Sequence, residues 1–203
     1  MRRAFVSYHH GNDQAYKNAL VEIAERNRIF VDWSVDIGDI SDDLDDQAVR
    51  RRIRDEYLRD STVTILLVGL ETRYRKHVDW ELKSSMIDGA VNRRSGVVVI
   101  SLPSTGCNYY TAVHDGEKDF YPDCNSWVSC DRAEYERRYP YLPERIIDNL
   151  VAPRTPISVT NWNRIADNPD FLRFLIEAAA EGREECEYDC SRPMRMRDGS
   201  PRL

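Results

Sequence analysis

Short apolar segments alternate with longer amphipathic segments along this chain, and the alternation predicts a sheet whose strands are connected by helices. The apolar segments are rich in the β-branched and aromatic residues that strands favour. The third segment is almost continuously apolar, which is typical of a central parallel strand covered on both faces. The five predicted strands comprise residues 4–8, 29–33, 61–68, 96–102 and 156–160.

The segments between the strands carry apolar residues at the spacing of a helical face. We expect Asn12 or Asp13 to cap the first helix, because both side chains accept hydrogen bonds from free helical N–H groups. The helix after the third strand carries one apolar stripe with Val78 and Leu82 and a second with Trp80. We therefore expect the sheet to cover one side of this helix and another segment to cover the other. The first two predicted helices end near residues 27 and 59. The others comprise residues 78–92, 131–139, 143–150 and 170–181.

Strands that alternate with helices in this way predict an α/β fold with a parallel sheet. The natural topology is a flavodoxin-like, three-layer, doubly wound sheet of five strands in the order 2-1-3-4-5. Its switch point lies between the first and third strands, so a ligand should bind where the loop after Tyr8 meets the loop after Val68. Residues 1–182 are predicted to form one domain with an insertion at about 103–154, and residues 183–203 a loosely ordered tail.

Composition narrows the class of partner. The 203 residues carry a net charge of −6, and general nucleic-acid-binding domains are normally basic, so nucleic acid is not the expected partner. No apolar run approaches the roughly 20 residues that span a bilayer, and the first residues are too polar for a signal peptide. The five cysteines lack the paired spacing of a zinc ribbon. We expect a cytoplasmic protein with reduced thiols and no metal site.

Several common ligand-binding motifs are absent from the sequence. There is no Gly-x-x-x-x-Gly-Lys-Ser/Thr loop and no Gly-x-Gly-x-x-Gly after the first strand, which argues against a P-loop NTPase and a conventional dinucleotide-binding fold. The predicted strand ends lack the acidic residues of a phosphoacceptor receiver domain. The absence of a Gly-x-Ser-x-Gly elbow argues against an α/β-hydrolase. One carboxylate stands out instead, because Glu81 follows the central strand near the carboxyl edge of the predicted sheet.

Two segments of the chain resemble TIR domains. Residues 4–9 read Ala-Phe-Val-Ser-Tyr-His, which is similar to the first box of that family, an apolar strand that ends in Ser-Tyr or Ser-Phe. Residues 61–88 contain Leu-Leu-Val-Gly and then Arg75-x-x-Val78-x-x-Glu81, and they resemble the third strand and following helix of the TIR-like proteins of bacterial Thoeris anti-phage defence. The resemblance covers about residues 3–102, and it rests on the order and spacing of these segments.

This resemblance implies an NAD glycohydrolase or ADP-ribosyl cyclase that uses NAD as its substrate and holds no tightly bound cofactor. TIR enzymes cleave the bond between nicotinamide and ribose, and Thoeris members make a cyclic ADP-ribose isomer that signals infection to a separate effector protein. The family's catalytic glutamate maps onto Glu81. Many TIR enzymes have Trp four residues earlier, where this chain has His77. A phage-derived activator and a homo-oligomer also fit the resemblance.

The expected chemistry gives a carboxylate a defined task, because cleavage of a glycosidic bond develops positive charge on the ribose. We therefore expect Glu81 to be catalytic, while its place near the start of a helix also allows it to complement the helix dipole. Each of the other candidate site residues could, instead of binding a ligand, simply end a strand, pack in the core or face solvent. The expected NAD-binding residues are Ser7, Tyr8, His9, Trp33, Arg75 and His77.

Two other functions remain open from the sequence. TIR domains also act as non-catalytic interaction modules, and the second apolar stripe around Trp80 would suit self-association. A nucleoside deoxyribosyltransferase-like enzyme would use a similar sheet and a carboxylate nucleophile on a different substrate. Function that survives replacement of Glu81 would favour the first alternative, and turnover of deoxynucleosides would identify the second.

Overall fold

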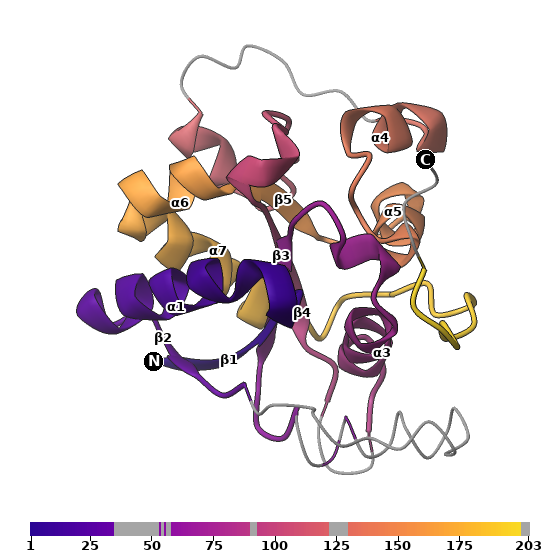
Figure 1. Ribbon diagram of the computed structural model, residues 1–203. Coiled ribbons are helices and arrows are strands. Elements are labelled where there is room, and N and C mark those ends of the chain that lie inside the picture. The colour runs from indigo at the N-terminus through magenta and orange to yellow at the C-terminus, as the bar shows by residue number, and fades with distance from the viewer. Residues whose placement is uncertain (35–52, 54, 56–57, 90–92, 122–129, 200–203) are drawn as a thin grey trace.

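A computed structural model describes residues 1–34, 53, 55, 58–89, 93–121 and 130–199 of the chain (Figure 1). The helix expected to end near residue 59 lies mostly outside this part of the chain. In the part that is described, no helix combines the length and the apolar character needed to cross a bilayer.

A five-stranded sheet forms the centre of the molecule. Its strands are β1 Arg2–Ser7, β2 Phe30–Asp32, β3 Val63–Val68, β4 Gly96–Ser101 and β5 Ser158–Asn161. All neighbours pair in parallel, in the order β2-β1-β3-β4-β5, which confirms the predicted fold class and topology. Every residue of β3 and β4 is buried, as expected for apolar strands with helices on both faces.

Helices cover both faces of this sheet and give the molecule three layers (Figure 1). They are α1 His10–Arg26, α3 Lys76–Ser85, α4 Arg132–Arg138, α5 Glu144–Val151, α6 Trp162–Asp167 and α7 Pro169–Gly182. Apolar side chains of α1, α6 and α7 share one core cluster with residues of β1, β3 and β4. Those of α3 and α5 form a second cluster on the opposite face.

The segment expected as an insertion, residues 103–154, contains the connection between β4 and β5. It includes two short 3-10 helices, Pro103–Thr105 and Glu117–Phe120, and then α4 and α5. Because a connection between parallel strands has to cross a face of the sheet, it normally includes a helix, and α5 serves this purpose. Part of the expected insertion therefore belongs to the doubly wound fold itself.

Three local predictions differ from the structure. The cap of α1 is neither Asn12 nor Asp13 but His9, whose ring Nδ1 accepts a hydrogen bond from the backbone N–H of Asn12 at 3.0 Å. α3 begins two residues earlier than predicted and ends at Ser85, well before residue 92. α6 has no counterpart among the predicted helices, because six residues are too few to establish a helical period.

The C-terminal tail, for which we expected loose order, follows α3 and α5 (Figure 1, yellow). The indole Nε1 of Trp80 donates a hydrogen bond to the carbonyl oxygen of Arg195 at 2.8 Å, and Met194 is buried in a cluster with Trp80. This tail is therefore part of the segment that we expected to cover the side of α3 that the sheet leaves open. The expectation of loose order rested on the charged composition of the tail. Side chains of α3 and α5 donate hydrogen bonds to its backbone carbonyl oxygens.

Candidate active site

Glu81 lies in the second turn of α3, and its side chain meets the carboxyl end of β1. Ser7, the last residue of β1, donates a hydrogen bond from its Oγ to Glu81 Oε2 at 2.5 Å. Glu81 is only 2% exposed. A carboxylate that merely complements the helix dipole would lie at the first turn on the helix surface, so the burial of Glu81 argues against that alternative.

Burial controls the ionisation of the Glu81 carboxyl group. Removal from water disfavours the charged form and raises the pKa to about 8, while the hydrogen bond from Ser7 lowers the pKa and so opposes this effect. At neutral pH the carboxyl group is therefore mostly protonated. A positive charge placed beside it would lower its pKa and so favour the carboxylate.

Replacing Glu81 by Gln is expected to change how stability depends on pH. The pKa of Glu81 rises from its ordinary 4.5 to about 8 on folding, so ionisation favours the unfolded chain and stability falls as the pH rises through this range. From about pH 5 to 8 the wild type should lose about 3 kcal/mol of unfolding free energy relative to Glu81→Gln. Urea unfolding of both proteins across this range measures the difference, and parallel pH curves would contradict the prediction.

A cleft of about 270 Å³ opens beside Glu81, between the start of α1 and the start of α3. It lies at the carboxyl ends of β1 and β3, whose following helices cover opposite faces of the sheet, so it occupies the predicted switch point. The structure brings five of the seven predicted site residues into its wall, and a sixth, Ser7, contacts Glu81. The lining residues are Tyr8, His9, His10, Gly11, Arg75, His77, Val78 and Glu81.

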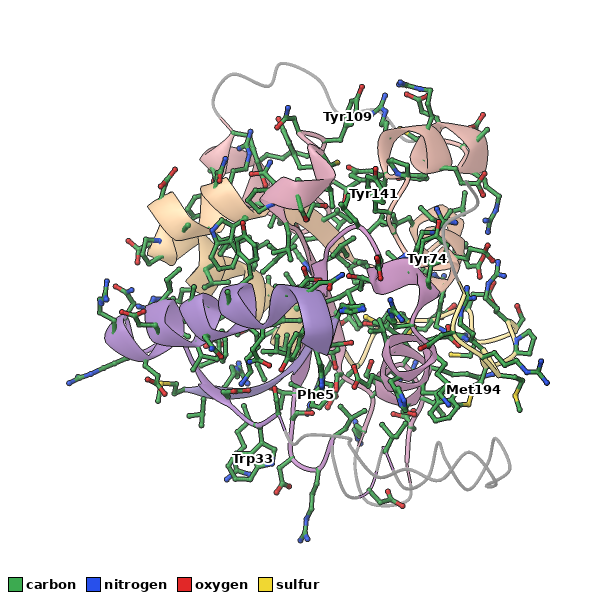
Figure 2. All side chains as sticks on the ribbon, viewed as in Figure 1. Phe5, Trp33, Tyr74, Tyr109, Tyr141 and Met194 are labelled. Atoms are coloured by element: carbon green, nitrogen blue, oxygen red, sulfur yellow. The ribbon has the colours of Figure 1, made fainter. Side chains whose placement is uncertain are left out.

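Trp33 is the predicted site residue that the structure places elsewhere. It is 39% exposed, and the guanidinium of Arg3 lies over its ring at 4.6 Å from the centroid. Figure 2 shows Trp33 far from Tyr74, which directly precedes Arg75 of the cleft. The strand order explains the separation, because β2 is an edge strand and the cleft lies between β1 and β3 on the other side of β1.

Glu71 joins two residues of the cleft, and the sequence reasoning missed it. Its carboxylate accepts a hydrogen bond from Arg75 Nη2, and its Oε2 lies 3.7 Å from His9 Nε2. These contacts hold the guanidinium and the imidazole in the wall of the cleft. The sequence feature that could have indicated this contact is the separation of four residues between Glu71 and Arg75, which is common for opposite charges on neighbouring turns.

Asp13 is a second buried carboxyl group at this edge of the sheet, and it was missed as well. It is 5% exposed, and burial raises its pKa. Its Oδ2 accepts a hydrogen bond from Thr72 Oγ1 at 3.4 Å, and Thr72 Oγ1 accepts one from the N–H of Gly69 at 2.9 Å. A Cβ at Gly69 would lie 2.6 Å from the carboxylate oxygens of Asp13, so a larger residue there would displace this carboxylate. Asp13 thus connects α1 to the loop after β3.

Two aromatic residues near Glu81 face different directions. The ring of His77 lines the cleft and meets the ring of Trp80 edge to face, with 5.2 Å between centroids. Trp80 is buried with Phe5 and Met194, away from the cleft. His77 is therefore the cleft residue at the position where many TIR enzymes carry Trp, and Trp80 does not replace that side chain.

The arrangement combines a carboxyl group of raised pKa, a hydroxyl group that orients it and a cleft large enough for a small substrate. Such a carboxylate can stabilise positive charge that develops on a bound sugar. The imidazole of His9 and the guanidinium of Arg75 in the same wall can donate hydrogen bonds to polar or anionic groups of a substrate.

A family model described as Thoeris protein ThsB, TIR-like domain, matches residues 5–106, half of the chain. This span begins in β1, ends after β4 and contains all seven predicted site residues. A search of curated proteins found no match.

Proposed function

Because the chain belongs to the family of TIR-like domains of the Thoeris protein ThsB, we propose that it cleaves the nicotinamide–ribose bond of NAD and forms a cyclic ADP-ribose-type signal in anti-phage defence. The observation that supports this most strongly is the buried Glu81 carboxyl group, held by Ser7 beside the cleft. In this proposal the reaction takes place in the cytoplasm, and a separate effector protein senses the signal.

Bond cleavage would proceed through an oxocarbenium-like state of the ribose. The bond between the ribose C1′ and the pyridinium nitrogen breaks, its electron pair goes to nitrogen, and nicotinamide leaves as a neutral molecule. The Glu81 carboxylate stabilises the positive charge that remains on the ribose. Either water or a nucleophile of the same ADP-ribose molecule then attacks C1′ and loses its proton, which gives the hydrolysed or the cyclic product. A closed cleft that excludes water favours the cyclic one.

The raised pKa of Glu81 couples substrate binding to ionisation. NAD carries a positive charge on its nicotinamide ring, and a positive charge near a carboxyl group lowers its pKa. Binding of NAD in the cleft therefore favours the carboxylate that the reaction needs. In the absence of substrate, the group is mostly neutral at pH 7, which reduces the cost of keeping it buried.

Incubation of the purified chain with NAD, followed by chromatographic separation, tests the proposed function. We expect free nicotinamide and a cyclic ADP-ribose-type product, at a rate that an extract of phage-infected cells raises if activation is required. Absence of nicotinamide release both with and without that extract would refute the proposal. Formation of linear ADP-ribose alone would support cleavage and refute cyclisation.

Ser7→Ala is expected to slow nicotinamide release about 10- to 100-fold. The exchange removes the hydrogen bond to Glu81 Oε2, and a hydrogen bond to a charged group is worth roughly 1.5–3 kcal/mol. Since this bond also lowers the pKa of Glu81, the activity of the variant should shift to higher pH. Steady-state rates across pH measure both effects, with Ser104→Ala, at an exposed position of the 3-10 helix after β4, as the control. An unchanged rate for Ser7→Ala would show that the bond does not matter for the reaction.

The structure favours the enzyme over the non-catalytic interaction module. The second apolar stripe around Trp80 would suit self-association, but Trp80 is 4% exposed and Met194 of the tail packs against it. The deoxyribosyltransferase-like alternative keeps a carboxylate at the same edge of the sheet. Incubation with deoxynucleosides in place of NAD distinguishes it, because only a transferase of that class would exchange their bases.

A further inference from the structure

A second cavity, of about 220 Å³, adjoins the Glu81 cleft and shares Arg75 and Val78 with it. It lies between the start of α3, the start of α5 and the C-terminal tail. Its wall is strongly cationic for a chain with a net charge of −6. The charged lining residues are Arg73, Arg75, Arg145, Arg192, Arg195, Asp79 and Glu144.

Three of the five arginines are held by carboxylates. These ion pairs account for both acidic residues of the wall, so no carboxylate of the lining remains for the other two arginines. The pairs are Arg145 with Asp79, Arg192 with Glu144 and Asp148, and Arg75 with Glu71 and Asp198.

Arg73 forms no ion pair with a residue that the structure describes. Its Nη1 donates to the carbonyl oxygen of Pro140, and its guanidinium lies over the ring of Tyr74 at 5.5 Å from the centroid. A guanidinium has five N–H donors, so most of those of Arg73 remain available to a ligand.

Arg195 is fixed by its backbone and not by its side chain. Its N–H donates to Asp79 Oδ2 at 2.8 Å, and its carbonyl oxygen accepts from Trp80 Nε1. Its guanidinium bonds to no other side chain among the described residues. Figure 2 shows Met194, the neighbour of Arg195, and Tyr74, the neighbour of Arg73, on the same side of the molecule. The fold thus brings to one cavity two arginines whose side chains have no carboxylate partner among the described residues.

We propose that Arg73 and Arg195 bind the diphosphate of the NAD substrate, with Arg75 at the junction of the two cavities. The inference rests on the proposed function, which places the nicotinamide ribose at Glu81. The rest of the dinucleotide then leaves the cleft past Arg75, the charged residue that both cavities share. Guanidiniums match phosphate oxygens in geometry as well as in charge, and a half-buried site strengthens the attraction.

Calorimetric titration with ADP-ribose tests this site without turnover, because ADP-ribose carries the diphosphate and lacks nicotinamide. Arg73→Gln and Arg195→Gln are each expected to weaken binding by about tenfold or more, since each loses a charge-assisted hydrogen bond. Arg197→Gln, in the same tail but outside the cavity, should change the dissociation constant less than twofold. Because the backbone of Arg195 keeps its bonds to α3, Arg195→Gln should melt at the wild-type temperature.

Competition by inorganic pyrophosphate tests the proposed phosphate site independently of the proposed reaction. Pyrophosphate should compete with ADP-ribose in the wild type and compete less well in both arginine variants. If NAD is cleaved but the affinity for ADP-ribose is unchanged in both variants, the site is refuted and the proposed function stands. If pyrophosphate binds in an arginine-dependent way and NAD is not cleaved, the anion site stands and its assignment to the NAD diphosphate is refuted.

Discussion

Glu81→Gln is expected to reduce nicotinamide release from NAD by at least about 10³-fold while the protein remains folded. Glutamine has nearly the same shape as the protonated glutamate that predominates at neutral pH, and it can still accept the hydrogen bond from Ser7. It cannot become negatively charged, so it cannot stabilise the developing charge on the ribose. Steady-state measurement of nicotinamide at saturating NAD gives the ratio of the two rates.

The matched control is Glu22→Gln, which removes an exposed carboxylate from the surface of α1 and should leave the rate unchanged. Circular dichroism and urea unfolding show whether both variants keep the fold, and Glu81→Gln should be the more stable protein above neutral pH. A folded Glu81→Gln variant that retains more than a tenth of the wild-type rate would refute the catalytic role of this residue.

Arg145→Met is expected to cost about 3–5 kcal/mol of unfolding free energy, the largest effect on stability that the structure suggests. The Arg145 side chain is fully buried, and it bonds both carboxylate oxygens of Asp79 at 2.9 and 3.1 Å. It also donates to the backbone carbonyls of Arg192 and Pro193 in the tail. Methionine would leave the half of Asp79 that Arg145 bonds without its ion-pair partner, while the backbone N–H of Arg195 would still donate to Asp79 Oδ2. Urea unfolding of the variant and the wild type measures the loss.

The double variant Asp79→Leu/Arg145→Met is the control for this explanation. Removal of both charges avoids the unpaired carboxylate, so the double variant should be more stable than Arg145→Met alone. In both variants the tail loses the two hydrogen bonds from Arg145 to its backbone, and limited proteolysis should cut it sooner than in the wild type. A loss below 1 kcal/mol for Arg145→Met would contradict the importance of this ion pair.

The fold was predictable because its signals are periodic and local. Apolar strands such as residues 63–68 are buried on both faces, and regular alternation with helices leaves few topologies for a parallel sheet. The switch point then indicated where the loops after β1 and β3 should meet. Ser7 and Glu81 are 74 positions apart in the chain, and their contact follows from this topology.

The remaining features depend on contacts that have no local signal. Asp13 was expected only as a candidate helix cap, and its burial follows from contact with Gly69 and Thr72 of the distant loop after β3. Trp33 was expected in the site because it ends a strand, but the edge position of β2 keeps it away from the cleft. The tail is bonded in part by Arg145, a residue about 50 positions earlier whose own burial has no signature in the sequence.

The pH dependence of kcat/KM for nicotinamide release by the wild-type chain tests the central claim most directly, because it reports the ionisation of the essential group in the free enzyme. If the carboxylate of Glu81 does the chemistry, kcat/KM should rise about tenfold per pH unit below pH 8 and level off above it, as the pKa of about 8 requires. A rate that is the same from about pH 6 to 9, or the absence of release at every pH, would contradict the account.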